Sequence, residues 1–219
     1  MEVLNRMVSA GLGIAATASI CFAWLAYAVM HNMMGWFDDA VRGFVHSWAS
    51  PMLTRCFEGI TELGSFPFLM LLGLLVAWTL ARRRRYRAAV ILAVSALGAQ
   101  GFDQLLKGIF RRTRPEAFFG VSPHSYSFPS GHSVESCCFY GVLAAIVAAN
   151  TRSRHVRVAL WVVAASITLA VGTSRIYLGV HYPTDVLGGY IAGVAWVALV
   201  WTGYQVWRSR RDSVIRLGE

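Results

Sequence analysis

Three short clusters of polar residues lie at the ends of long apolar stretches, and together they could bind and transfer a phosphoryl group. The clusters are Lys107 with Arg114-Pro115, the sequence Pro-Ser-Gly-His at 129–132, and Ser174-Arg175 followed by His181 and Asp185. They supply three fixed cations, two histidines and one carboxylate. Because a phosphoryl group in transfer spreads negative charge over three oxygens, this set of groups suits phosphoryl transfer.

Phosphate binding is the predicted role of the cationic and small residues. The planar guanidinium of arginine donates two parallel hydrogen bonds to phosphate oxygens. A glycine lets the backbone approach an anion, and the start of a helix presents free N–H groups to it. The predicted phosphate ligands are Lys107, Arg114, Ser130, Gly131 and Arg175.

The two histidines are predicted to divide nucleophilic and acid–base catalysis. His181 and Asp185 are four residues apart, so they share one face if this stretch is helical. An aspartate bound to one imidazole nitrogen fixes the tautomer and leaves the other nitrogen free to attack. His132 would protonate the leaving oxygen and then activate water.

A metal site is the strongest chemical alternative, since the spacing His-x-x-x-Asp can bind zinc. Three nearby cations would repel a divalent ion, and the sequence places no second carboxylate to offset them. We therefore expect no metal and no other cofactor.

Several charged residues near the clusters are assigned other roles. Arg111 and Arg112 are expected to anchor the chain at the membrane interface, outside the site. Asp103 is expected to be a helix-pairing partner, and the role of Glu135 stays open.

The composition indicates an integral membrane protein. Of the 219 residues, 56% are hydrophobic and only 14% are charged, whereas about 25% of residues are charged in soluble domains. The net charge of +9 would also suit a nucleic-acid-binding protein. However, the basic residues occur in short runs between apolar stretches, as in cytoplasmic loops that follow the positive-inside rule. We expect no nucleic-acid partner.

Six apolar stretches approach the length of about 20 residues that a helix needs to cross the hydrocarbon core. They cover 8–30, 66–81, 88–109, 134–150, 156–174 and 185–206. If the first residues are cytoplasmic, the arginine-rich runs are cytoplasmic as well, and all three clusters share the opposite face. The sequence predicts an all-α integral membrane bundle of six transmembrane helices in one domain over 1–219, with both termini cytoplasmic.

The connection between the first two spans, residues 31–65, interleaves aromatic and charged side chains. This spacing suits a short amphipathic helix in the membrane interface on the external side. The favoured role of the segment is an ordinary cap over the bundle, and the alternative is that it guides a lipid to the site.

At the three clusters the chain resembles the type 2 phosphatidic acid phosphatase family, whose signature is K-x6-R-P, P-S-G-H and S-R-x5-H-x3-D. Here the parts are KGIFRRTRP at 107–115, PSGH at 129–132 and SRIYLGVHYPTD at 174–185, and every signature position matches. The resemblance implies a six-helix lipid phosphatase that works through a phosphohistidine and needs no metal. It implies the same roles: His181 as nucleophile, Asp185 as its partner, His132 as acid and base, and Lys107, Arg114, Ser130, Gly131 and Arg175 as phosphate ligands. Vanadium haloperoxidases share this pocket, but the membrane helices argue against that branch.

The leading hypothesis is a phosphatase of the bacterial cytoplasmic membrane that acts on a lipid phosphate or diphosphate at the external leaflet. The family suggests undecaprenyl diphosphate, phosphatidylglycerol phosphate or phosphatidate, and its frequencies favour a polyprenyl diphosphate. One alternative is a lipid phosphotransferase that uses the same residues. Another is a non-catalytic lipid-phosphate carrier, which the pairing of His181 with Asp185 argues against, since binding alone would require only the cations. The oligomeric state stays open.

Overall fold

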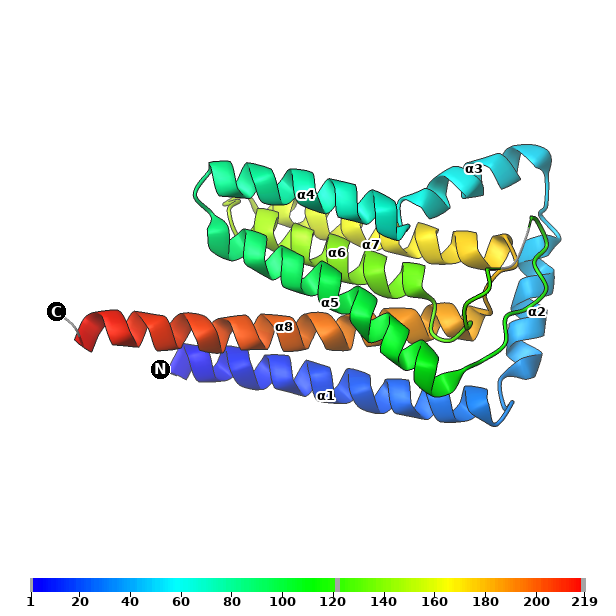
Figure 1. The fold of residues 1–219 in the computed structure, drawn as a ribbon, viewed down its shortest axis with the longest axis horizontal. Coiled ribbons are helices and arrows are strands. Elements are labelled where there is room, and N and C mark those ends of the chain that lie inside the picture. The colour runs from blue at the N-terminus through cyan, green and yellow to red at the C-terminus, as the bar shows by residue number, and fades with distance from the viewer. Residues whose placement is uncertain (1, 121–122, 218–219) are drawn as a thin grey trace.

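The computed structural model describes residues 2–120 and 123–217, and within these ranges the chain forms eight α-helices and no strand. Six of the helices run along one another, while α2 lies across one end of the bundle and α3 leans outward beside it (Figure 1). The all-α architecture agrees with the prediction. The helices are α1 (Glu2–Met30), α2 (Gly35–His46), α3 (Pro51–Glu62), α4 (Phe66–Arg82), α5 (Tyr86–Phe110), α6 (Gly131–Ala148), α7 (Arg154–Tyr177) and α8 (Pro183–Leu217).

Five of the described helices are long and apolar enough to cross a membrane, namely α1, α5, α6, α7 and α8. The predicted span 66–81 corresponds to α4, which meets this criterion only together with α3, across a bend of 48°. The bend arises because Ser65 starts a new helix: its Oγ accepts a hydrogen bond from the backbone N–H of Phe68, and a proline occupies the first turn. The predicted second span is therefore part of a bent helix pair, and the described helices give six spans only if this pair is one span.

Residues 31–65 form two helices, which differs from the prediction of one short helix. Ser50 caps α3 by accepting a hydrogen bond from Leu53 N–H at 3.3 Å, and Pro51 begins the helix. Helix α3 then packs on α7, where Thr54 Oγ1 lies 2.9 Å from the hydroxyl of Tyr177. Within this segment α2 covers the end of the bundle, and α3 leads from there to α4 (Figure 1).

The core is centred on α6, which packs between α5, α7 and α8. Glycines allow α8 to approach it closely: a Cβ at Gly189 would lie 2.6 Å from the Cβ of Ser133, and one at Gly193 would lie 2.8 Å from the Cβ of Cys137. The outer helix faces carry exposed large apolar side chains such as Ile20 and Leu71, as suits contact with lipid. The tight α6–α8 contact fixes the two helix starts that carry the second and third clusters.

Candidate active site

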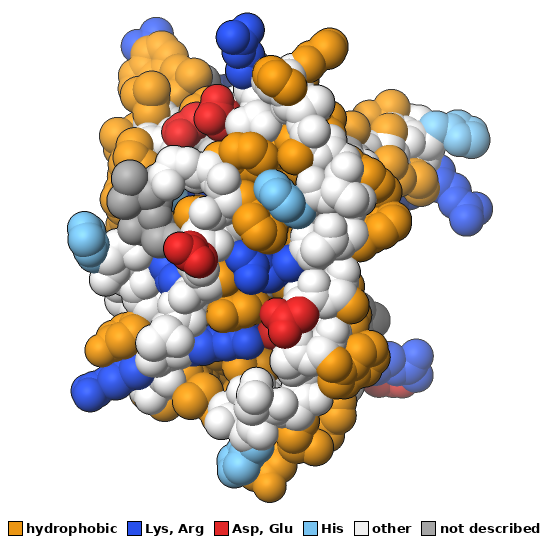
Figure 2. All heavy atoms as spheres, turned by 90° about the vertical axis from the view of Figure 1, so that its right-hand side faces the viewer, with side chains coloured by type: hydrophobic (Ala, Val, Ile, Leu, Met, Phe, Trp, Pro, Cys, Tyr) orange, Lys and Arg blue, Asp and Glu red, His pale blue; other side chains and the backbone are white. Residues whose placement is uncertain are grey.

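The structure brings the three clusters to the same end of the bundle, the end that α2 covers. Lysine and arginine side chains lie in the middle of this face, among hydrophobic side chains (Figure 2). The contributing positions are Lys107 in the last turn of α5, Arg114 in the α5–α6 connection, Ser130 to His132 at the start of α6, Arg175 in the last turn of α7, His181 just before α8 and Asp185 in its first turn.

The ring of His181 lies between the carboxylate of Asp185 and the guanidinium of Arg114. Its Nδ1 lies 3.3 Å from Asp185 Oδ2, and Arg114 Nη1 lies 2.9 Å from its Nε2. Because a guanidinium can only donate hydrogen bonds, Nε2 must accept, and the ring proton is on Nδ1. Burial lowers the pKa of His181 to about 3, against the opposing hydrogen bond to Asp185. His181 is therefore a neutral imidazole with its lone pair directed at Arg114.

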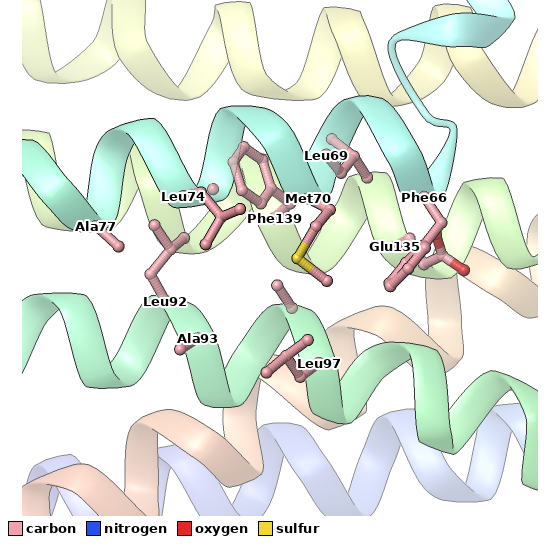
Figure 3. Close-up of a pocket in the computed structure, with 12 residues that line it drawn as sticks. Phe66, Leu69, Met70, Leu74, Ala77, Leu92, Ala93, Leu97, Glu135 and Phe139 are labelled. Carbon is pink, nitrogen blue, oxygen red and sulfur yellow. The ribbon is translucent and has the colours of Figure 1, made fainter.

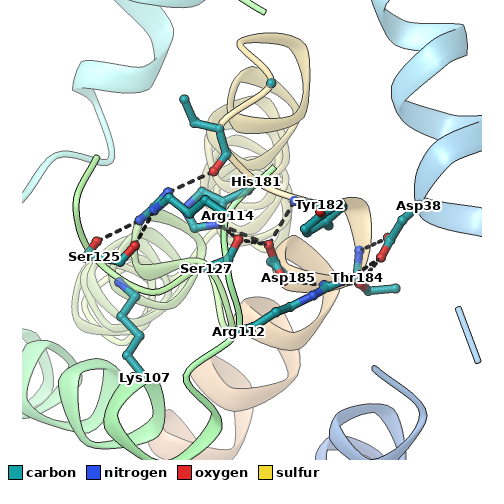
Figure 4. A network of polar contacts seen from close by, with 12 residues as sticks. Asp38, Lys107, Arg112, Arg114, Ser125, Ser127, His181, Tyr182, Thr184 and Asp185 are labelled. Atoms are coloured by element: carbon teal, nitrogen blue, oxygen red, sulfur yellow. Dashed lines mark hydrogen bonds and ion pairs between the residues drawn. The ribbon is translucent and has the colours of Figure 1, made fainter. Parts of the chain in front are cut away.

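Asp185 is enclosed by hydrogen-bond donors (Figure 4). Besides His181, its Oδ2 accepts from Ser127 Oγ and, at 2.9 Å, from the backbone N–H of Tyr182. Its Oδ1 accepts from Arg112 Nη1 at 2.6 Å. The side chain is fully buried, so these donors fix the orientation of the carboxylate and, through it, that of the imidazole.

The interpretation of Arg112 as an anchor outside the site is wrong. Its guanidinium pairs with Asp185 and, at 2.8 Å, with Asp38 Oδ2, and it lies 4.0 Å from the centre of the Tyr182 ring. Burial alone would lower the pKa of Arg112, but the two carboxylates outweigh burial and raise it. The end of α5 explains why Arg112 lies in the site. Arg111 has a φ of 48° there and turns the chain, so that the side chain of Arg112 meets α8.

Asp38 is a second buried group that the sequence analysis missed. It is 1% exposed and comes from α2, yet it bonds to the start of α8. Its Oδ1 accepts from the backbone N–H of Thr184 at 2.9 Å, and its Oδ2 accepts from the Thr184 hydroxyl at 2.8 Å. Asp38 thus caps the helix that carries Asp185. The sequence offers no local signal for it, because its partners are 74 and 146 positions away.

Lys107 extends from the last turn of α5, and its Nζ lies next to Gly131 at the start of α6. A Cβ at Gly131 would lie 2.9 Å from Lys107 Nζ and 2.8 Å from Asp103 Oδ2, so a larger residue would displace these side chains. Lys107 also pairs with Asp103 at 2.7 Å. Asp103, expected to pair helices, therefore bonds to a lysine of its own helix.

Two predicted phosphate ligands carry buried polar atoms without a partner. Ser130 Oγ and Arg175 Nε form no hydrogen bond with the described part of the chain. The first residue is fully buried and the second is 8% exposed, although Arg175 Nη1 donates to Thr61 at 2.8 Å. Since buried polar groups are normally satisfied, a bound oxyanion would explain both.

His132 faces the same charges. Arg175, His181 and Lys107 act on it electrostatically, and its ring forms no hydrogen bond with another described residue. Within residues 2–120 and 123–217, no three His, Cys, Asp or Glu side chains gather where they could hold a metal ion. The arrangement provides a neutral imidazole whose unprotonated Nε2 accepts a hydrogen bond from Arg114, a second imidazole, and cations around them.

Several known proteins have sequences similar to that of this chain. The model of the PAP2 superfamily matches residues 88–209. The phosphatidylglycerophosphatase B of Bacillus subtilis is 34% identical over 186 residues, which cover 82% of this chain and 89% of the relative. An undecaprenyl-diphosphatase of Sulfolobus acidocaldarius is 26% identical over 124 residues, covering 54% of this chain and 55% of the relative.

A solved structure shows the same fold. The transmembrane PAP2-type phosphatidylglycerolphosphate phosphatase of Bacillus subtilis superposes with a TM-score of 0.78 at 30% identity, covering 85% of this chain and 93% of that chain.

Proposed function

The chain belongs to the PAP2 superfamily, and on this basis we propose that it hydrolyses a lipid phosphate or diphosphate through a phosphohistidine at His181. The relatives and the apolar helices indicate a multi-pass membrane protein that hydrolyses phosphoric esters. The observation that carries the proposal is the position of the His181 ring, with Nδ1 3.3 Å from Asp185 Oδ2 and Nε2 2.9 Å from Arg114 Nη1, from which the proton is assigned to Nδ1.

In the first step, Nε2 of His181 attacks the phosphorus and the bond to the lipid oxygen breaks. His132, protonated at this point, gives its proton to that oxygen. Arg114 moves its hydrogen bond from Nε2 to a phosphoryl oxygen, where it joins Lys107, Arg175, the Ser130 hydroxyl and the backbone N–H groups at the start of α6. These donors stabilise the charge of the transition state.

In the second step, His132, now neutral, takes a proton from water, and the resulting hydroxide attacks the phosphorus. The bond between phosphorus and Nε2 breaks and inorganic phosphate leaves. Asp185 holds the proton on Nδ1 throughout and stabilises the positive charge of the phosphorylated ring.

A narrow apolar cavity beside the site supports a lipid substrate. It encloses about 100 Å³ between α4 and α5 and ends at Glu135, one turn after His132 on α6 (Figure 3). An acyl or prenyl chain lying between these helices would bring its headgroup to the cations. Glu135 would then border the entrance to the site.

The proposal includes a membrane arrangement. The broken pair α3–α4 serves as the sixth span, α2 lies in the interface, and the whole chain 1–219 forms one domain. The arginine-rich ends of the helices and both termini face the cytoplasm of a bacterium. The site then opens on the periplasmic side of the cytoplasmic membrane, because it lies at the other end of the bundle.

A substrate panel tests the proposed function. We expect the purified protein in detergent, with EDTA present, to release inorganic phosphate from phosphatidylglycerol phosphate, phosphatidate or undecaprenyl diphosphate. The Bacillus subtilis relative favours the first of these, in place of the polyprenyl diphosphate that family frequencies suggest. If the substrate carries a labelled phosphate, transfer of that label to a second lipid would indicate a phosphotransferase. Loss of activity on chelation would contradict the metal-free mechanism. Substrate added to intact spheroplasts should also be hydrolysed before lysis if the site is periplasmic.

The contacts of Asp38 predict that it positions the site from α2. Asp38→Asn removes the charge that pairs with Arg112 and weakens the cap of α8, so Asp185 loses part of its support. We expect kcat to fall about 10- to 100-fold, while KM changes little because the phosphate ligands are untouched. Steady-state kinetics measure both constants. The matched control is Asp39→Asn, which removes the same charge from an exposed neighbour. Equal rates in both variants would show that Asp38 has no such role.

A further inference from the structure

A second hollow lined by basic residues lies at the end of the bundle opposite the active site. It encloses about 590 Å³ between the start of α5, the end of α6 and the distal part of α8. In Figure 1 this is the end of the α4–α5 connection, far from α2. From Arg85 to Lys107 the helix rises about 33 Å, so the hollow is separate from the catalytic cations. Its polar and aromatic lining consists of Arg84, Arg85, Tyr86, Arg87, Asn150, Trp201, Tyr204 and Gln205.

Gln205 places a polar amide in the lining of the hollow. The residue is 6% exposed and lines the hollow, and its side-chain amide forms no hydrogen bond with any described residue. The carboxamide can offer both an N–H and a carbonyl oxygen to a bound molecule.

The charge of the hollow is unbalanced. The side chains of Arg84 and Arg85 form no ion pair with the part of the chain that the structure describes, and no acidic residue is found among the described lining residues. Arg87 lies over the ring of Trp207, 5.7 Å from its centre. The free guanidinium groups therefore favour an anion, for which arginine is the preferred ligand when the anion is a phosphate.

The rest of the lining is apolar, and this decides what kind of anion fits. Ile91, Ala145 and Ile146 line the hollow together with Trp201. A free phosphate ion would gain nothing from these groups, whereas a lipid would contact them with its glycerol and acyl carbons. Tryptophan and tyrosine side chains are typical of the headgroup level of a bilayer.

We propose that this hollow binds the phosphodiester headgroup of an anionic glycerophospholipid such as phosphatidylglycerol. Arg84 and Arg85 pair with the phosphate, and Gln205 bonds to an ester carbonyl or a glycerol hydroxyl. The lipid is bound unchanged. Basic hollows between transmembrane helices are known to suit anionic lipid headgroups.

Native mass spectrometry of the detergent-purified protein, titrated with dioleoyl phosphatidylglycerol, tests the proposal. We expect Arg84→Gln with Arg85→Gln to weaken binding of the first lipid about 30-fold. Gln205→Leu keeps the charge, and we expect it to weaken binding about fivefold. The matched control is Arg152→Gln with Arg154→Gln, which removes two charges at the same end of the bundle but outside the hollow. This control should bind within about twofold of the unmodified protein. Phosphate release shows that each variant is folded.

Several results would overturn the proposal. Equal affinity in all variants would show that the hollow does not hold the lipid. An equal loss in the control would show diffuse surface attraction instead of a site. Zwitterionic phosphatidylcholine bound as tightly would show that charge is not recognised. Displacement of the lipid by inorganic phosphate at similar concentration would show a site for free anions.

Discussion

Replacing His181 with alanine is expected to lower the turnover number for phosphate release by about 10⁴-fold or more. The variant lacks the nitrogen whose lone pair faces the phosphate ligands, while Lys107, Arg114 and Arg175 stay in place. Substrate binding should therefore change much less than turnover. Rates of phosphate release under saturating substrate measure the loss directly.

The control for this variant is His124→Ala, which removes an exposed histidine from the connection that carries Arg114. It should keep the rate within about twofold, because surface substitutions away from a site have small effects. If His181→Ala retained a tenth or more of the activity, His181 would not be the nucleophile.

Asp185→Asn is expected to lower kcat by about 10³- to 10⁴-fold with the fold intact. The amide no longer holds the proton on Nδ1, and Arg112 loses one of its two carboxylates. The hydrogen bond to Asp185 raises the pKa of His181 against its burial. Its loss lowers this pKa further, so His181 stays neutral at pH 7 and protonation does not cause the defect.

The dependence of kcat on pH distinguishes this explanation from a simple charge effect. We expect the profile of Asp185→Asn to run parallel to that of the unmodified protein from pH 5 to pH 9, displaced downward throughout. Recovery of the rate at either end of the range would mean that titration, and not orientation of the imidazole, limits the variant. Asp39→Asn again serves as the control with the same change of charge.

The sequence was sufficient to predict five of the membrane-spanning helices and the shared location of the three clusters, for a physical reason. Long apolar runs separated by arginines define membrane helices regardless of tertiary contacts. The motif residues of each cluster lie close together in the sequence, so local patterns place Lys107 at the end of one helix and Gly131 at the start of the next. The chemistry of their side chains then limits what they can do together.

The sequence could not predict the contacts that depend on distant elements. Asp38 and Arg112 bond across 74 positions, and the interpretation of Arg112 failed because an arginine at a helix end usually snorkels to the interface. The left-handed conformation of Arg111 instead directs the side chain of Arg112 to Asp185. The division of residues 31–65 into two helices was also missed, although Ser50-Pro51 is a typical helix start.

The central claim, a phosphohistidine at His181, is tested most directly by trapping it. A substrate with a ³²P-labelled terminal phosphate and a good leaving group is mixed with the His132→Ala variant, and the protein is denatured in alkali and digested. Without His132 to activate water, the intermediate should accumulate, and the acid-labile label should be found on the peptide that contains His181. Label on Ser130 or on another residue, or no labelled protein in this variant, would contradict the claim.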